Sequence, residues 1–357
     1  MKNIYKGDDL MKNRIDLSKY QIRTDLVIEN LDNEKNSEYI NVEKIAENIK
    51  VTTIEVDNNL CQKLNKKTGT YITIEFEDVT NHEDQLQVTN TLENELKKIL
   101  KKQNIKEKDN CLIIGLGNKD STADSLGPKV IDKVLVTRHL FELKAEVKPG
   151  IRNISAIAPG VMATTGIETY DIITSLVDKI KPKFLILIDA LASSSISRIN
   201  KTIQITDTGI HPGSGIGNNR KEISKEQIGI PTIAIGVATV VESSIIVNDT
   251  ITYLFKHLSY IKNNYSMNKL IVTHNKNYLN NKNIQDLTLN EKKEISGILG
   301  ELDEQEKIEL INEVLTSLNY NLIVTPKEID FLVDKLSQVI SKALNKALNK
   351  AVASGQK

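Results

Sequence analysis

The chain is poor in the residues that mark several protein classes. It has no tryptophan and only two cysteines, Cys61 and Cys111, among 357 residues. Two cysteines are too few for a disulfide framework or a cysteine-rich metal site. The 47 basic and 47 acidic residues leave a formal net charge of zero. The cationic surplus that nucleic-acid coat proteins and polybasic membrane binders need is therefore missing.

Long apolar segments are missing as well. No run approaches the roughly 18 apolar residues of a membrane span, and residues 1–10 lack the apolar region of a secretory signal. We therefore expect a cytoplasmic globular protein with no membrane partner and no direct nucleic-acid partner. The length suits one large domain or two ordinary ones.

Three short apolar runs predict buried strands, at 111–116, 184–188 and 231–235. Segments with helical spacing lie between or after them, roughly at 126–143, 165–180 and 246–257. Continuous apolar strands that alternate with helices are typical of a mostly parallel sheet covered on both faces. The expected fold is therefore α/β, with a mostly parallel sheet flanked by helices.

The flanking regions are less regular. Residues 26–65 have weak patterning that is compatible with helix, while 70–76 alternate like a strand. The composition of 258–290 shifts to asparagine, lysine and tyrosine, which predicts a polar, variable insertion. Extra C-terminal helices are expected near 290–318 and 326–353.

The short motifs of several enzyme classes are incomplete or missing in the sequence. Gly115 and Gly117 follow a strand as in a dinucleotide-binding turn, but Asp120 stands where that fingerprint needs its third glycine. There is no Walker A sequence, no Gly-x-Ser-x-Gly elbow and no His-Glu-x-x-His pair. A zincin is therefore excluded, whereas a looser metal site that uses His211 stays open.

Two acids have a setting that suggests catalysis. Asp189 follows the run 184–188, and Asp124 lies just beyond the run 111–116. Because the carboxyl ends of parallel strands meet at one edge of the sheet, we expect the two side chains to lie on that edge. Two close carboxyls do not both ionise easily, so one holds a proton while the other acts as a base. The alternative is that Asp124 caps the helix near Leu126 and Asp189 caps a turn.

A glycine-rich stretch, 208–221, is the second unusual feature. Its four glycines let the backbone approach a ligand closely, and His211, Arg220 and Lys221 add polar and cationic groups. The alternative is a surface loop with solvated charges.

Several long blocks of sequence resemble one family. They lie in the same order along the chain, at 118–128, 135–143, 158–169, 188–192, 205–215 and 322–330. These blocks are similar to those of the spore germination protease (GPR endopeptidase) family. The resemblance covers nearly the whole chain except part of 30–60 and the stretch 258–290.

The resemblance implies an atypical aspartic peptidase that uses no cofactor and no metal. Members degrade small acid-soluble spore proteins as germination begins, and their fold is similar to that of hydrogenase maturation proteases. The essential acids of the family match Asp124 and Asp189. The resemblance also implies a homotetramer that resides in the forespore or spore core.

The resemblance implies that the N-terminal residues are a propeptide. The family is made as an inactive zymogen, and residues 20–29 resemble its cleavage sequence, with an acid before the bond, an apolar residue after it and another acid downstream. Self-cleavage is therefore expected between Asp25 and Leu26. The implied organisation is a propeptide (1–25), an α/β peptidase core (26–257), the insertion (258–290) and a C-terminal helical segment that completes the catalytic domain (291–357).

Selectivity for an acid before the bond needs a cation in the pocket. Arg220 and Lys221 are the first candidates, with Arg138 behind them and His211 as a further substrate-binding residue. Two other functions stay open. One is a metal-dependent maturation-type protease that uses Asp124, Asp189 and His211, and the other is a non-catalytic binder whose acids only cap helices.

Overall fold

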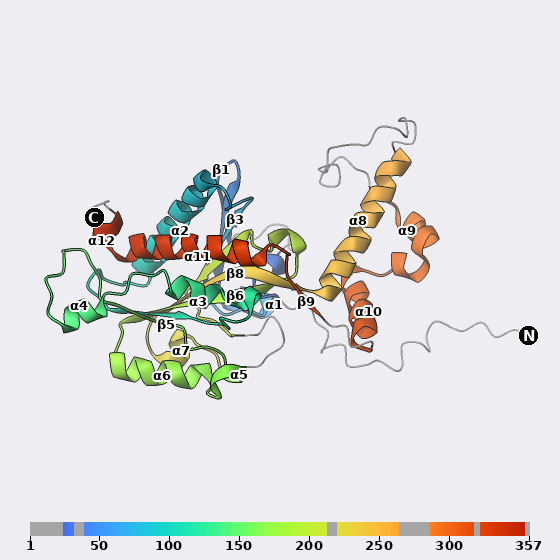
Figure 1. Ribbon diagram of the computed structural model, residues 1–357. Coiled ribbons are helices and arrows are strands. Elements are labelled where there is room, and N and C mark those ends of the chain that lie inside the picture. The colour runs from blue at the N-terminus through green and yellow to red at the C-terminus, as the bar shows by residue number, and fades with distance from the viewer. Residues whose placement is uncertain (1–23, 32–38, 213–219, 264–285, 318–321, 354–357) are drawn as a thin grey trace, which may run out of the picture. The chain divides into compact units, whose positions relative to one another are not determined.

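The computed structural model describes residues 24–31, 39–212, 220–263, 286–317 and 322–353. The described chain forms two compact units (Figure 1). The sheet unit falls within residues 23–241 and 324–357, and the helical unit within 242–323.

The sheet unit is built on strands in the order β1-β2-β3-β7-β8-β6-β4-β5. Strands β8, β6, β4 and β5 are parallel to one another, whereas β1, β2, β3 and β7 extend the sheet with antiparallel pairs. The bounds are β1 (Ile40–Ala46), β2 (Ile49–Val56), β3 (Gly69–Phe76), β4 (Cys111–Gly115), β5 (Ile154–Ile157), β6 (Phe184–Ser193), β7 (Thr202–Thr206) and β8 (Thr232–Glu242). The predicted α/β class and the parallel core are confirmed.

The antiparallel half differs from the prediction. Residues 26–65 have patterning compatible with helix, and they do form the 3₁₀ turn Val27–Asn30 and the short helix α1 (Asn58–Leu64), but the hairpin of β1 and β2 lies between these two elements. The helical expectation was wrong for the hairpin: β1 is largely exposed, so it carries no alternating apolar signal, and the alternation of buried residues in β2 is interrupted at Thr52 and Thr53.

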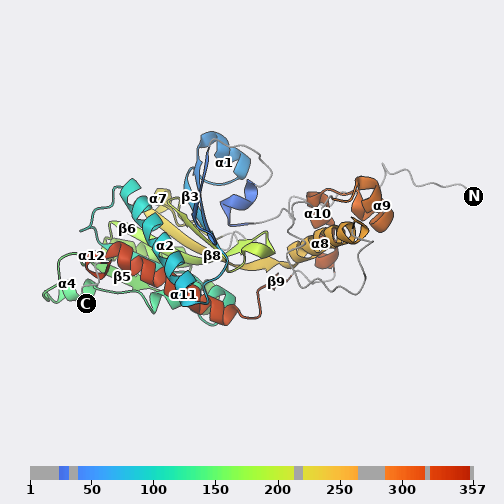
Figure 2. The ribbon, with the colours of Figure 1, turned by 90° about the horizontal axis from the view of Figure 1, so that it is seen from above.

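Helices cover both faces of the parallel core (Figures 1 and 2). In β4, Cys111 and Ile113 pack with residues of α2 (His82–Lys102), α3 (Leu126–Ile131) and α11 (Ile329–Leu348). The alternate residues, Leu112 and Ile114, pack on the other face with α6 (Thr169–Ile180). This division follows from the two-residue side-chain period of a strand, and it explains why both sets are apolar in the sequence.

Two predicted helices are interrupted. The segment 126–143 forms α3 and, after a break, α4 (Arg138–Glu142). In the break the N–H of Leu135 donates to the side chain of Asn345 at 2.8 Å, so α11 provides the bond that a continuous helix would have made. The segment 165–180 is interrupted after α5 (Met162–Thr165) by Gly166, whose φ of 70° is left-handed.

The helical unit contains α8 (Ser243–Asn263), α9 (Leu289–Ser296) and α10 (Glu304–Ser317). The predicted helix at 290–318 is thus two helices, separated by the 3₁₀ turn Gly297–Gly300. Of the expected insertion at 258–290, residues 264–285 lie outside the described residues, and its first part continues α8. The remaining short elements are α7 (Lys225–Ile228), β9 (Ile323–Val324) and α12 (Lys350–Ala353).

Helix α3 lies directly on β4 through two glycines. A Cβ atom at Gly115 would be 2.3 Å from the carbonyl oxygen of Gly127, and one at Gly127 would be 2.2 Å from that of Leu116. Neither position tolerates a side chain without a backbone shift. The glycines at 115 and 117 resembled a nucleotide-binding turn in the sequence. In the structure, Gly115 instead allows α3 to pack closely against β4.

We expect Gly127→Ala to lower the free energy of unfolding by about 3 kcal/mol, the upper end of overpacking costs, because the added methyl group would meet backbone atoms of Leu116. Urea unfolding measures this loss. Gly166→Ala is the matched control, since no atom lies within 4 Å of the added Cβ and only the left-handed φ costs about 1 kcal/mol. Equal losses in both variants would contradict the overpacking.

Candidate functional site

Asp124 ends the 3₁₀ turn Thr122–Asp124 that leads into α3. Gly117 makes room for it, because a Cβ atom there would lie 2.1 Å from the carbonyl oxygen of Asp124 and 3.0 Å from its carboxylate. The N–H of Asn118 donates to Oδ2 of Asp124 at 2.8 Å. The contact of α3 with β4 and the turn at Gly117 thus fix this carboxyl above the end of β4.

Asp189 lies within β6 and is 7% exposed. Its Oδ1 accepts a hydrogen bond from the N–H of Ala190 at 2.9 Å. In the sheet Asp189 pairs with Gly236 of β8, and Gly236 pairs in turn with Gln204 of β7. Directly paired residues point to the same face of a sheet, so Asp189 and Gln204 flank a residue that has no side chain.

The two carboxyls influence each other electrostatically. Burial raises the pKa of Asp124, against the hydrogen bond from Asn118 and the positive charge of Arg220. Burial raises the pKa of Asp189 well above its ordinary value, and the negative charges of Asp124 and Asp25 raise it further. A buried carboxyl beside a second acid retains its proton at a pH where an exposed one has lost it. The pair can therefore supply both a proton donor and a proton acceptor.

The residues just after 23 are docked against the end of β6. We call residues 24–31 the docked segment. Its Asp25 makes two hydrogen bonds with Ala192: the N–H of Asp25 donates to the carbonyl (3.1 Å), and Oδ2 accepts from the N–H (2.9 Å). Leu26 and Val27 are fully buried in an apolar cluster that also contains Leu191. Apolar burial and backbone pairing together hold the segment in place.

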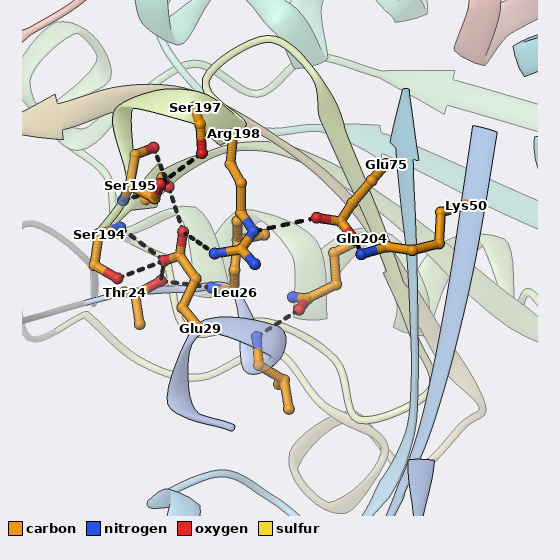
Figure 3. Close-up of polar contacts among 12 residues, drawn as sticks. Thr24, Leu26, Glu29, Lys50, Glu75, Ser194, Ser195, Ser197, Arg198 and Gln204 are labelled. Carbon is orange, nitrogen blue, oxygen red and sulfur yellow. Dashed lines mark hydrogen bonds and ion pairs between the residues drawn. The ribbon is translucent and has the colours of Figure 1, made fainter. Parts of the chain in front are cut away.

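Gln204 bonds to the docked segment on both sides of the bond between Asp25 and Leu26. Its Nε2 donates to the carbonyl oxygen of Asp25 at 3.1 Å. Its Oε1 accepts from the N–H of Val27 at 2.8 Å, the contact drawn from Gln204 in Figure 3. The side chain of Gln204 is nearly buried. One amide therefore fixes the register of the segment on the sheet.

The family model of the germination protease matches residues 20–357. The chain belongs to the germination protease family. It is 43% identical over 345 residues to a germination protease of Bacillus velezensis, a match that covers 92% of this chain and 94% of that protein. A germination protease of Oceanobacillus iheyensis is 45% identical over 333 residues, covering 88% of this chain and 91% of that protein. Membership identifies the chain as a peptidase of spore germination.

Among solved structures, a [NiFe] hydrogenase maturation protease of Thermococcus kodakarensis matches with a TM-score of 0.25 and 19% identity. The match covers 40% of this chain and 80% of that protein.

The cations and the histidine predicted to bind substrate do not all lie beside the two acids. Arg220 is near enough to Asp124 and Asp189 for its charge to lower the pKa of each. The ring Nε2 of His211 lies 2.7 Å from the carbonyl oxygen of Arg220. By contrast, Lys221 pairs with Asp171 on α6 (3.1 Å), and Arg138 pairs with Glu142 within α4 (2.7 Å). The structure therefore groups Arg220 with the two acids and pairs the other two cations elsewhere.

A cation that no sequence motif indicated lies beside the docked segment. The Nζ of Lys66 donates to the carbonyl of Thr24 at 2.7 Å. Burial lowers the pKa of Lys66, while the charges of Asp25 and Glu29 act in the opposite direction. Gln204 was missed as well. Neither residue belongs to a motif, so only the fold brings them to the segment.

No group of three or more histidine, cysteine, aspartate or glutamate side chains in the described parts of the chain is arranged to hold a metal ion. Within those same parts, none of the helices is long and apolar enough to cross a membrane.

The raised pKa of Asp189 predicts a pH-dependent stability. The folded state binds the Asp189 proton more tightly than the unfolded chain does, so this group destabilises the fold as the pH rises above the ordinary aspartate pKa of about 4. We expect Asp189→Asn to remove that loss. The melting temperature of the variant minus that of the wild type should be near zero at about pH 4 and should grow to several degrees by neutral pH.

Calorimetry across that pH range measures the difference. Asp178→Asn is the control, because Asp178 is exposed on α6 and its replacement should leave the profile unchanged. A variant of Asp189 that is less stable than the wild type at neutral pH would contradict the expected sign.

Proposed function

We propose that the chain is an endopeptidase that initiates degradation of small acid-soluble spore proteins during germination, cleaving after glutamate or aspartate and before an apolar residue. It is made as a zymogen that cleaves itself between Asp25 and Leu26. The observation that supports this most directly is the docked segment, which lies on the sheet with the charge of Asp25 acting on Asp189. Membership of the germination protease family supports the substrate class.

In the proposed reaction, Asp124 and Asp189 share one proton. It resides mainly on Asp189, whose pKa is raised by burial and by two negative neighbours, and Asp124 acts as the base. The carboxylate of Asp124 takes a proton from water, whose oxygen attacks the carbonyl carbon, while Asp189 protonates the carbonyl oxygen. The C–N bond then breaks as Asp124 gives its proton to the leaving amine, and Asp189 takes back a proton from one hydroxyl of the intermediate, so that a carboxylic acid forms and both acids return to their starting states. No metal takes part in these steps.

Gln204 assists at the carbonyl oxygen. Its Nε2 donates to the carbonyl oxygen of Asp25 at 3.1 Å, within the range over which amide donors stabilise a developing oxyanion. Because the opposite end of the same amide accepts from the N–H of Val27, the bond that breaks is held from both sides.

The acid before the bond is recognised by the backbone and by cations. The N–H of Ala192 donates to the carboxylate of Asp25. Lys66 and Arg220 supply positive charge near it, Lys66 through its interaction with Asp25 and Arg220 through its effect on Asp189. His211 and Lys221 complete the proposed substrate-binding set. We further propose, from the family alone, that the enzyme is a homotetramer in the forespore or spore core.

Self-cleavage tests the pair of acids directly. The purified wild-type chain should lose residues 1–25 and begin at Leu26, whereas Asp124→Asn and Asp189→Asn should each remain full length, because each removes one of the two proton-transfer groups. Intact-mass analysis and N-terminal sequencing identify the product. Asp178→Asn should be cut like the wild type.

A chelator added during processing should leave the cut unchanged, whereas loss of cleavage with chelator would favour the metal-dependent alternative. A mature N-terminus other than Leu26 would contradict the proposed bond. Normal processing of both asparagine variants would contradict the roles of Asp124 and Asp189 and support a non-catalytic binder.

Gln204→Met keeps the size of the side chain but removes its donor and acceptor. We expect self-cleavage to slow about 10- to 100-fold, because one preorganised donor to the carbonyl oxygen is lost. The rate is followed by intact mass over time. Gln227→Met, at an exposed position of α7, should cleave at the wild-type rate, and an unchanged rate in Gln204→Met would remove the glutamine from the mechanism.

A further inference from the structure

A large cavity lies at the edge of the sheet opposite the two acids. It is bounded by the residues just before β4, β5 and β6, by the ends of α2 and α11, and by Phe141 of α4. Because these strands are parallel, their amino ends share one edge, whereas Asp124 and Asp189 lie toward the other. Figures 1 and 2 show α4 and α12 together at this end of the sheet unit. The cavity is therefore separate from the candidate active site.

The cavity is strongly basic although the whole chain is neutral, and we call it the cationic cavity. Eight basic and two acidic side chains line it, whereas the full sequence has equal numbers of the two kinds. The dipoles of α2 and α11 favour Lys101 and Lys346 in their last turns. Lys108 and Lys183, which we call the strand lysines, come just before β4 and β6. No helix end accounts for the positions of the strand lysines.

Only some of these cations are neutralised by acids of the protein. Nζ of Lys97 lies 2.5 Å from a carboxylate oxygen of Glu93, and Lys350 pairs with Glu107. Within the described parts of the chain, neither Lys101 nor the strand lysines form an ion pair. A concave surface lined by one sign of charge concentrates ligands of the opposite sign. The arrangement therefore favours an anion as the occupant.

Arg152 forms the buried part of the cavity wall. It is 5% exposed, and its guanidinium lies 5.2 Å from the centre of the Phe184 ring. Nη1 donates to the carbonyl oxygens of Lys106 (2.8 Å) and Asp109 (2.6 Å), and Nε donates to that of Leu348 (3.3 Å). Among the described residues, no group accepts from Nη2 and no carboxylate pairs with this arginine. Burial lowers the pKa of Arg152 despite the charge of Asp109. The fold thus fixes a positive charge here and leaves N–H donors for an anion.

The cavity also has room and apolar surface for an organic ligand. Its volume of about 990 Å³ is within the range of small-molecule sites. Leu100, Phe141 and Pro149 contribute apolar wall. A phosphate group carries about two negative charges and three acceptor oxygens, and arginine and lysine are the side chains suited to bind it. The combination of clustered cations and apolar wall favours a phosphate-bearing organic molecule over a simple anion.

We propose that the cationic cavity binds a small phosphorylated organic molecule, with its phosphates on Arg152 and the strand lysines and its apolar part against Phe141. This site goes beyond the proposed function, because it lies at the opposite edge of the sheet from Asp124 and Asp189 and requires neither of them.

Isothermal titration calorimetry of the full-length chain with three probes tests the ligand class. ATP, without divalent cations, should bind the wild type with a sub-millimolar Kd. Inorganic triphosphate should bind more weakly, because it has the charge but no apolar part. Adenosine should not bind detectably, because it has the apolar part but no phosphate.

A double variant locates the binding. Lys108→Gln combined with Lys183→Gln should raise the Kd of ATP about 10- to 100-fold, because two charged hydrogen bonds to phosphate become neutral. Both side chains are exposed, so circular dichroism should show an unchanged fold. Lys179→Gln combined with Lys225→Gln is the matched control. It removes the same charge from exposed positions on α6 and α7 and should keep the wild-type Kd.

Absence of ATP binding to the wild type would overturn the site. A wild-type Kd in the variant of the strand lysines, or equal weakening in the two double variants, would overturn it as well. Adenosine that binds as tightly as ATP would overturn recognition of phosphate, and triphosphate that binds as tightly would overturn the role of the apolar wall. Self-cleavage is measured separately, so each of these results leaves the proposed peptidase function untouched.

Discussion

The rest of the site depends on the burial of one carboxyl group within the parallel part of the sheet. Asp189 is almost inaccessible to water, and two other acids raise its pKa further. Such a group is stable only when neutral or partnered. The surrounding features serve this requirement: Ala190 donates a hydrogen bond, Arg220 supplies opposing charge, and Gly117 lets Asp124 come close. The contact of α3 with β4 is therefore part of the site as much as of the fold.

The docked segment shares this electrostatic constraint, because it brings two acids onto the sheet. The carboxylate of Asp25 accepts a hydrogen bond from the N–H of Ala192 and raises the pKa of Asp189, whereas the buried carboxylate of Glu29 accepts from the N–H and the hydroxyl of Ser194. The apolar side chains of Leu26 and Val27 offset part of the cost of burying these acids. In the proposed reaction, cleavage lets Asp25 leave, and one of the charges that hold the proton on Asp189 leaves with it. Binding of the segment and the protonation of the pair are thus coupled.

The sequence was informative where local pattern determines structure. Three apolar runs predicted the buried strands, and their carboxyl ends led to Asp124 and Asp189, because parallel strands align those ends. The hairpin of β1 and β2 was missed, since the edge strand β1 is exposed and the apolar alternation of β2 is interrupted at Thr52 and Thr53. Lys66 and Gln204 were also missed. They contact residues 42 and 179 positions away in the chain, and no spacing rule links residues so far apart.

The central claim is that burial, together with the charges of Asp124 and Asp25, raises the pKa of Asp189 well above the ordinary aspartate value. NMR titration of ¹³C-labelled aspartate carboxyls measures this directly, with Asp189→Asn used to assign the signal. We expect one carboxyl that keeps the chemical shift of the protonated form to a pH well above that at which the other aspartates ionise, and this signal should be absent from the variant. A wild-type spectrum in which every aspartate carboxyl has ionised by about pH 5, near the ordinary aspartate range, would contradict it.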